Sequence, residues 1–112
     1  AATVKAKVIC ELANGPTTPE GDEVLHKNGV HVIPDFLCNA GGVTVSYYEM
    51  VQNMYMHYWT VDDVYAKLDA AMSAAYANVY AAAEKYNINM RQAAYVVAVE
   101  RVVEAMKLRG WV

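Results

Sequence analysis

The chain has 112 residues, of which 56% are hydrophobic and 19% are charged, and its formal net charge is -3. This composition is typical of one packed domain or of part of a larger protein, and it excludes disorder as the main state. Nine Lys and Arg stand against twelve Asp and Glu, so no basic stripe marks nucleic acid as a partner. The sequence contains neither a run of about 18 uncharged apolar residues nor a signal-peptide pattern. We therefore expect no membrane association and a cytoplasmic location.

The cysteines and histidines predict no metal site. Cys10 and Cys38 are too few for a disulfide framework and lie far from any second ligand at metal-binding spacing. His26, His31 and His57 share no spacing with each other or with a cysteine that would suit zinc. We expect both thiols to be reduced and packed, and the histidines to be surface or packing residues.

The first third of the chain predicts a strand, a helix and a second strand. Residues 4–13 alternate and then become apolar, as in a strand covered on both faces. Thr18 is placed as the N-cap of a short helix over 19–27, and Gly29 is placed to end it. Residues 30–33 predict the second strand. A strand-helix-strand unit of this length predicts a parallel pair with a right-handed crossover, and hence an α/β fold.

The remainder predicts a loop and three helices. The loop covers residues 36–42, and apolar residues at helical spacing follow over 43–57. The capping-box pattern Thr60-Val-Asp-Asp63 opens a long, alanine-rich helix that runs to about Lys85. Asn89 is a suitable N-cap for the last helix, over 91–108.

Two parallel strands do not make a stable sheet, because their edges and faces need cover. A G-x-G-x-x-G pyrophosphate loop, typical of dinucleotide-binding domains, does not occur in the sequence. We expect the missing strands, and the loop of any cofactor site, to precede Ala1 in a longer protein.

Four strings carry a resemblance to a known family. They are Leu12-Ala-Asn-Gly-Pro-Thr-Thr-Pro-Glu, the run from Ile33 to Asn53 that includes Asn-Ala-Gly-Gly-Val-Thr-Val-Ser-Tyr-Tyr-Glu, Met90-Arg-Gln-Ala-Ala-Tyr, and Arg109-Gly-Trp-Val. Together they resemble the C-terminal quarter of glutamate dehydrogenase of the hexameric bacterial and archaeal type, within the Glu/Leu/Phe/Val dehydrogenase family. The resemblance covers essentially the whole chain.

The resemblance implies both a fold and a reaction. Residues 1–86 would finish an NAD(P)-binding Rossmann-like domain, with the strand-helix-strand unit to about residue 42 and helices after it. Residues 87–112 would return to the substrate domain. The implied reaction is the reversible oxidative deamination of L-glutamate to 2-oxoglutarate and ammonia, with hydride transfer to NAD or NADP. The implied partners are the remainder of the enzyme and further subunits of a homo-oligomer, a hexamer in the family.

The resemblance also implies which parts are absent from this segment. The catalytic lysine and aspartate of the family, and its Gly-rich loop, belong to earlier sequence. We therefore expect no catalytic residue here and no activity from the isolated chain. The choice between NAD and NADP stays open, because the residue that reads the ribose follows the Gly-rich loop.

Ser46 and Val43 are the expected substrate contacts. By resemblance, the Ser46 hydroxyl binds the side-chain carboxylate of glutamate and Val43 lines the pocket. From the residues alone, Ser46 could instead bond its own helix backbone, and Val43 could be an ordinary core residue.

Asn14, Asn39, Gly41 and Gly42 are the expected coenzyme contacts. Both asparagines follow predicted strands, at the carboxyl ends where open α/β sheets bind ligands, and an amide can both donate and accept. By resemblance they approach the nicotinamide and its ribose. The glycines would admit a close approach of the ligand or make a turn, and a turn role is also the alternative for the asparagines.

Two other functions remain open. Related leucine, phenylalanine and valine dehydrogenases have apolar groups where glutamate dehydrogenase binds the carboxylate, and Ser46 in the pattern V-x-V-S-Y favours glutamate. The third hypothesis is a non-catalytic module whose apolar helices associate with themselves.

Overall fold

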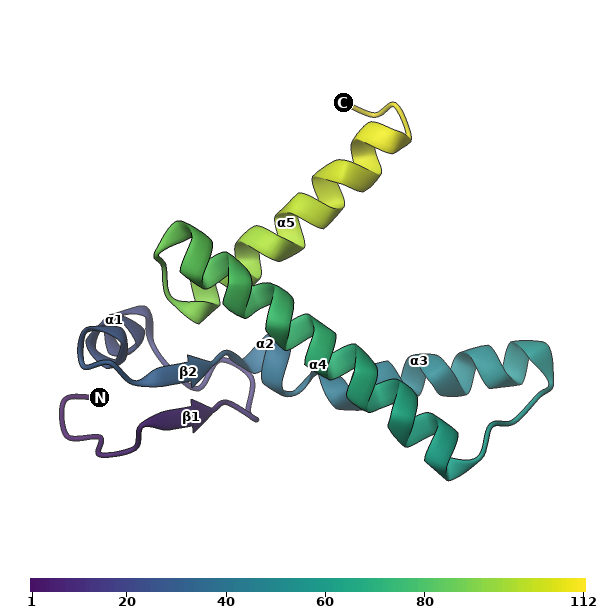
Figure 1. The fold of residues 1–112 in the computed structure, drawn as a ribbon, viewed down its shortest axis with the longest axis horizontal. Coiled ribbons are helices and arrows are strands. Elements are labelled where there is room, and N and C mark those ends of the chain that lie inside the picture. The colour runs from purple at the N-terminus through teal and green to yellow at the C-terminus, as the bar shows by residue number, and fades with distance from the viewer.

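The computed structural model describes residues 1–112 as a two-stranded sheet with five helices beside and beyond it (Figure 1). The elements in chain order are β1 (Val8–Cys10), α1 (Pro19–Lys27), β2 (His31–Ile33), α2 (Asp35–Cys38), α3 (Ala40–Tyr55), α4 (Val61–Tyr86) and α5 (Met90–Leu108). The strands are parallel, with Ile9 opposite Val32, and α1 is the crossover between them. This confirms the predicted α/β unit.

The helix ends follow the chemistry of the sequence. Thr18 caps α1 by accepting a hydrogen bond from a backbone N–H of the first turn, and Gly29 follows the helix with φ of 71°. Thr60 and Asp63 form the predicted capping box at the start of α4. Asn89 caps α5 in the same way as Thr18 caps α1. These local signals explain why the bounds of α1, α4 and α5 agree with the prediction.

The predicted first strand is too long. β1 has three residues instead of spanning 4–13, and both Val8 and Cys10 are exposed. The sheet has only two strands, so no second neighbour holds the flanking residues extended. The expectation that the Cys10 thiol is packed is therefore wrong, although both cysteines are free as expected.

The predicted loop over 36–42 is also wrong. α2 occupies 35–38 and α3 begins at Ala40, with Asn39 as the joint between them. Gly41 and Gly42 therefore lie in the first turn of α3. Glycine disfavours the interior of a helix by about 1 kcal/mol, which is why the sequence pattern favoured a loop. The tertiary contacts of α2 and α3 override that local preference.

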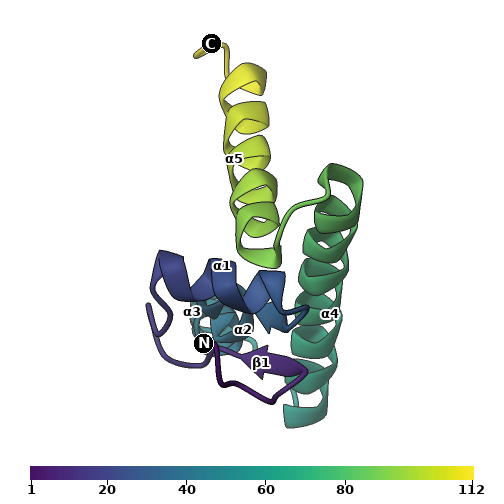
Figure 2. The ribbon, with the colours of Figure 1, turned by 90° about the vertical axis from the view of Figure 1, so that its left-hand side faces the viewer.

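The core is small and lies mainly where α5 crosses α4. Ala93 is fully buried there, among Val79, Ala82, Ala83, Met90, Ala94 and Leu37 of α2. Only 12 of 112 residues are buried, and α3 contains none of them. Figures 1 and 2 show α5 projecting away from the sheet, while α3 and α4 form a long arm. The radius of gyration, 16.7 Å, exceeds the value of about 13 Å for a compact chain of this length.

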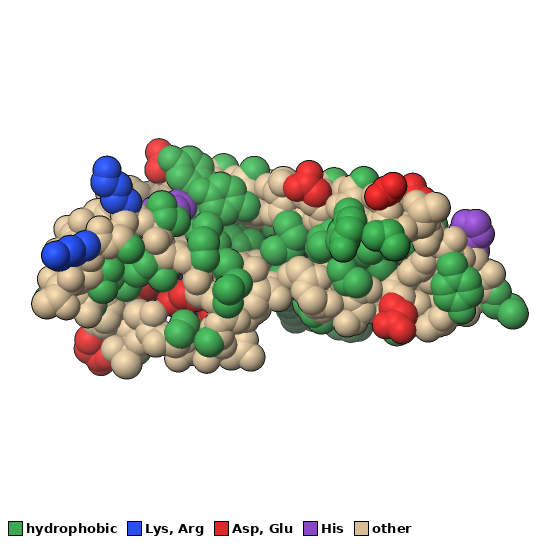
Figure 3. Space-filling view, turned by 90° about the horizontal axis from the view of Figure 1, so that it is seen from below, with side chains coloured by type: hydrophobic (Ala, Val, Ile, Leu, Met, Phe, Trp, Pro, Cys, Tyr) green, Lys and Arg blue, Asp and Glu red, His purple; other side chains and the backbone are tan.

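Large apolar side chains remain open to solvent along the arm and along α5. Examples are Tyr47, Met54, Tyr55 and Met56 near the end of the arm, and Val102 on α5. Figure 3 shows hydrophobic side chains over much of the face seen from below. Exposed apolar side chains in this number are typical of surfaces that another chain or segment covers.

We predict that the isolated 112-residue chain associates with itself at micromolar concentration, because association covers this apolar surface. Size-exclusion chromatography with light scattering measures the mass directly. A monodisperse monomer that unfolds cooperatively in urea would contradict the prediction.

One guanidinium joins four segments of the chain. The Arg91 side chain, in the first turn of α5, contacts Glu11 after β1 through Nη2 at 2.7 Å. Its Nη1 contacts Asp35 of α2 at 3.1 Å, and its Nε contacts Asp22 of α1 at 3.2 Å. Glu11 and Asp22 are buried, with 3% and 8% of their surface exposed. The planar fork of arginine suits this arrangement, because its three nitrogens reach three carboxylates at once, with Nη2 also donating to Asp22 Oδ1 at 3.4 Å.

We predict that Arg91→Met lowers the free energy of unfolding by about 3 kcal/mol, because it leaves three neighbouring carboxylates without a cation. Arg101→Met, an exposed position on the same helix, is the matched control and should change stability by about 0.5 kcal/mol or less. Urea unfolding followed by circular dichroism, at one protein concentration, compares the two. Equal effects of both substitutions would show that the guanidinium does not hold the segments together.

Candidate functional site

The structure brings the two candidate asparagines into direct contact. The Asn39 side chain donates through Nδ2 to Asn14 Oδ1 at 2.7 Å and to the Leu12 carbonyl at 3.3 Å. Asn14 lies in the loop after β1, and Asn39 follows β2 by one helical turn. The amide pair therefore sits at the carboxyl end of the parallel sheet, the edge where open α/β sheets bind ligands.

The amide pair presents one acceptor and one donor to solvent. Asn39 Oδ1 and the Asn14 amide nitrogen make no hydrogen bond within the chain. The orientation of Asn39 is defined by its neighbours, since a reversed amide would place its oxygen against two other oxygens. A carbonyl and an NH2 group without partners can accept from and donate to ligand groups such as a primary carboxamide or a hydroxyl.

Both ends of α2 hold the loop that carries Asn14. At the first residue of α2, Asp35 Oδ2 accepts a hydrogen bond from the Gly15 N–H at 2.8 Å. At the other end, Asn39 makes the two bonds to the loop described above. Gly15 has φ of 59°, a left-handed conformation that glycine adopts without strain. The loop is thus fixed over α2 by one carboxylate and one amide.

The surroundings of Asp35 and Arg91 shift the pKa of each group in the direction that favours its charged form. The Gly15 N–H lowers the pKa of Asp35 most strongly; partial burial opposes the shift, and the Phe36 N–H and Arg91 add to it. Burial by itself would lower the pKa of Arg91, but its bonds to Glu11 and Asp22 raise that pKa overall. A lowered pKa means that the stability contributed by the Asp35 carboxylate is present above pH about 4 and is lost as pH falls through the folded-state pKa.

Val43 and Ser46 continue from the amide pair along one face of α3. They follow Asn39 by four and seven residues, so they share its face, and Ser46 lies about 10 Å further along the helix axis. Both are exposed, and Val43, at 69% exposed, is not a core residue. Ser46, Glu49, Met50, Asn53 and Met54 line an open groove of about 440 Å³.

The Ser46 hydroxyl is bonded to its own helix in this structure. Its Oγ donates to the Gly42 carbonyl at 3.1 Å, which is the alternative role that the sequence left open. The bond does not fix the hydroxyl permanently, because Ser46 is exposed and a hydroxyl rotates to suit an incoming acceptor.

Gly41 and Gly42 do not form the turn that was one of their expected roles. A Cβ on Gly41 would lie 3.8 Å from Leu68 Cδ1, an ordinary contact, and a Cβ on Gly42 would meet nothing. The packing of this chain therefore does not require glycine at position 42. Gly42 shares the exposed face of α3 with Ser46, so its open side lies beside the candidate substrate contact.

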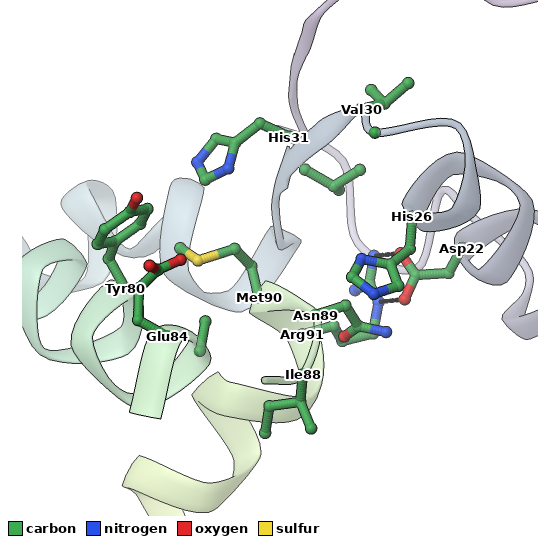
Figure 4. A pocket seen from close by; sticks show the side chains of 13 residues that line it. Asp22, His26, Val30, His31, Tyr80, Glu84, Ile88, Asn89, Met90 and Arg91 are labelled. Atoms are coloured by element: carbon green, nitrogen blue, oxygen red, sulfur yellow. Dashed lines mark hydrogen bonds and ion pairs between the residues drawn. The ribbon is translucent and has the colours of Figure 1, made fainter. Parts of the chain in front are cut away.

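A separate cavity of about 240 Å³ lies between α1, β2 and the turn before α5 (Figure 4). His31 and Tyr80 line one side, and His26, Asp22 and Arg91 line the other. His31 Nε2 lies 3.0 Å from the Tyr76 hydroxyl. Asp22 and Arg91 are bonded to each other here. The cavity therefore adjoins the ionic cluster, which consists of Arg91 with Glu11, Asp22 and Asp35, and not the amide pair.

Sequence reasoning missed the four charged residues of the ionic cluster next to the site. Glu11, Asp22, Asp35 and Arg91 lie up to 80 residues apart, and no spacing pattern relates them. The one available signal was Glu11, a carboxylate within an otherwise apolar run, because buried acidic residues are almost always paired. The structure contains no group of three His, Cys, Asp or Glu side chains placed to hold a metal ion. None of its helices combines the length and the apolarity that a membrane span requires.

Comparison with known proteins gives a consistent result. The chain is similar to the NAD-specific glutamate dehydrogenases of Clostridioides difficile and Peptoniphilus asaccharolyticus, with 53% identity to each over 111 residues. Each alignment covers 99% of this chain and 26% of the relative. The crystal structure of the Peptoniphilus asaccharolyticus glutamate dehydrogenase matches with a TM-score of 0.93 at 53% identity, over 98% of this chain and 28% of that one. The hetero-hexameric glutamate dehydrogenase of Thermus thermophilus, in its Leu-bound form, matches with a TM-score of 0.89 at 33% identity. This match covers 95% of this chain and 26% of that one.

The chain thus spans about a quarter of the length of these relatives. The sequence model of the Glutamate/Leucine/Phenylalanine/Valine dehydrogenase family matches residues 1–110. The sequence, the parallel α/β unit and the agreement with these solved structures all lead to one assignment: the chain belongs to the Glutamate/Leucine/Phenylalanine/Valine dehydrogenase family.

Proposed function

We propose that this chain is the C-terminal segment of an NAD-dependent glutamate dehydrogenase. The observation that carries the proposal is the exposed Asn14–Asn39 amide pair, with Ser46 on the same face of α3. The enzyme would catalyse the reversible conversion of L-glutamate to 2-oxoglutarate and ammonia. Two relatives at 53% identity named as NAD-specific glutamate dehydrogenases support both the substrate and the choice of NAD.

The amide pair would bind the nicotinamide end of the coenzyme. The free Asn39 oxygen would accept, and the free Asn14 NH2 would donate, to the carboxamide or to a ribose hydroxyl. Gly41 and Gly42 would leave room for the ligand beside the first turn of α3. When bound, the coenzyme supplies the acceptor for the hydride of glutamate. The residues of this chain fit that role because their two amide groups are in contact and each leaves one polar group without a partner in the chain.

Ser46 and Val43 would bind the substrate beyond the coenzyme. The Ser46 hydroxyl would exchange its bond to the Gly42 carbonyl for one to the side-chain carboxylate of glutamate. Val43 would provide an apolar wall between this contact and the amide pair. The spacing of about 10 Å along α3 leaves room for a small amino acid between coenzyme and hydroxyl.

The remaining roles concern the larger enzyme. Residues 1–86 would complete a Rossmann-like coenzyme domain, whose further strands would pair with the open edge of the sheet, and residues 87–112 would pack on the substrate domain. The catalytic lysine and aspartate and the pyrophosphate loop would come from outside these residues. The apolar surface of α3 and α5 and the hetero-hexameric Thermus thermophilus relative support an oligomeric enzyme. The proposal for this chain is a homo-oligomer.

We predict that Ser46→Ala in the full-length enzyme raises KM for glutamate by roughly ten- to a hundredfold and leaves kcat nearly unchanged. The lost hydrogen bond to a charged group is worth roughly 1.5 to 3 kcal/mol and is present in both ground and transition states. Steady-state kinetics with glutamate varied at saturating NAD measure the effect.

Thr44→Ala is the matched control for Ser46→Ala. Thr44 also bonds a carbonyl four residues earlier, at 2.8 Å, but it is half-buried. We expect this variant to keep the wild-type KM. An unchanged KM for Ser46→Ala would exclude Ser46 from the site, and turnover of leucine or valine in place of glutamate would assign the chain to a related dehydrogenase.

We also predict that the isolated 112-residue chain does not reduce NAD or NADP with glutamate, because its sequence has no G-x-G-x-x-G loop and, by the family resemblance, the catalytic lysine and aspartate would lie outside it. The assay follows the absorbance of the reduced coenzyme, with the full-length enzyme as positive control. Turnover by the pure isolated chain would contradict this prediction. Failure of the full-length enzyme to oxidise glutamate would contradict the proposed function itself.

A further inference from the structure

We propose that Asp35, held by Arg91, is a positioning residue for the coenzyme site. Its carboxylate fixes the Gly15 turn, and through that turn it places Asn14 against Asn39. The inference rests on the proposed role of the amide pair in coenzyme binding, and it assigns a function to an ionic cluster that would otherwise only stabilise the fold.

The first step of the argument is that hydrogen bonds, not apolar packing, hold the loop over 12–15. Leu12 is 72% exposed, and the three residues that follow it are exposed as well. The polar attachments of the loop to the rest of the chain are the two bonds from Asn39 and the bond from the Gly15 N–H to Asp35. Releasing Asp35 would therefore free the Gly15 end of the loop.

The second step is that α2 fixes the positions of the two residues, Asp35 and Asn39, that make these bonds. The Asn39 N–H donates to the Asp35 carbonyl at 2.8 Å, so one helical turn fixes the spacing of the two residues. The Asp35 N–H donates to Glu11 Oε2 at 3.0 Å, and Leu37 is buried in the core. The positions of Asp35 and Asn39 are thus set together, and Asn14 meets Asn39 only when Gly15 is in place.

The third step is that Arg91 orients the Asp35 carboxylate. Nη1 binds Asp35 Oδ1 and leaves Oδ2 for Gly15, while Nη2 of the same guanidinium binds Glu11. Without this guanidinium, Asp35 Oδ1 and Glu11 Oε2 would both lose a charged donor, and nothing else in the chain bonds Asp35 Oδ1. The guanidinium therefore holds the rotamer of Asp35 that reaches the loop.

Asp22 provides an internal comparison. Its carboxylate binds Arg91 at 3.2 Å, as Asp35 does at 3.1 Å, but its side chain bonds no residue of the loop. Its side chain is also buried to a similar degree, 11% exposed against 15% for Asp35. Loss of either carboxylate weakens the ionic cluster, and only the loss of Asp35 reaches the amide pair.

The test compares Asp35→Asn with Asp22→Asn in the full-length enzyme. We expect Asp35→Asn to raise KM for NAD about tenfold, since an amide cannot accept from both Gly15 and Arg91 as the carboxylate does. KM for glutamate should change by about twofold or less. Asp22→Asn should lower the melting temperature by a similar amount and leave KM for NAD within about twofold of wild type.

Two results would overturn the inference: a wild-type KM for NAD in Asp35→Asn, or an equal rise in Asp22→Asn. If Asp35→Asn does not fold, Arg91→Lys replaces it. A lysine keeps the charge but cannot bind three carboxylates, so we expect KM for NAD to rise several-fold, and an unchanged value would equally overturn the inference. A wild-type enzyme without activity on glutamate and NAD would instead show that the proposed function is wrong.

Discussion

The structure depends on one largely buried ionic cluster, which Arg91 forms with Glu11, Asp22 and Asp35. Three carboxylates from three segments converge on the single guanidinium of Arg91, which is 20% exposed, while the Glu11 side chain is 1% exposed. A carboxylate at that depth persists only when it is paired and hydrogen-bonded, and Glu11 accepts from Arg91, Thr17 and the Asp35 N–H. The end of β1, the first turn of α5 and the start of α2 must therefore stay together.

This ionic cluster and the apolar core have different roles in the fold. The core joins α2, α4 and α5, and Ala93 of α5 is its most deeply buried residue. The cluster joins the same α5 to the sheet, where little apolar surface is buried. The candidate site is adjacent to the cluster, so its geometry rests mainly on polar contacts. Polar contacts are directional, which suits a site that must hold two amides in one relative orientation.

The parts of the fold that could be predicted from the sequence are those with local causes. Thr18, Thr60 and Asn89 fix the starts of three helices by bonding groups within one turn, so their positions can be read from neighbouring residues. The α2–α3 joint could not be read in this way, because Gly41 and Gly42 disfavour a helix locally and only tertiary contacts overcome that preference. The length of β1 was overestimated for the related reason that a strand needs a partner, which its own residues do not reveal.

The candidate site shows the same division. The positions of Asn14 and Asn39 after their strands indicated one sheet edge, and the structure places both side chains there in contact. The residues that hold them in place were not predicted, because Arg91 and its partners are related only through the folded chain.

The separation of these residues along the chain also bears on the order of folding. The bonds of Arg91 join residues 56, 69 and 80 positions apart, and contacts of such separation form late, after local helices, because closing a long loop costs entropy first. The loop over 12–15 is synthesised before α5, but its support is complete only when α5 has docked. Until then the chain would carry Asn14 and Asn39 without a fixed relative position, and a nascent chain that had not yet made α5 would have both amides but no assembled site.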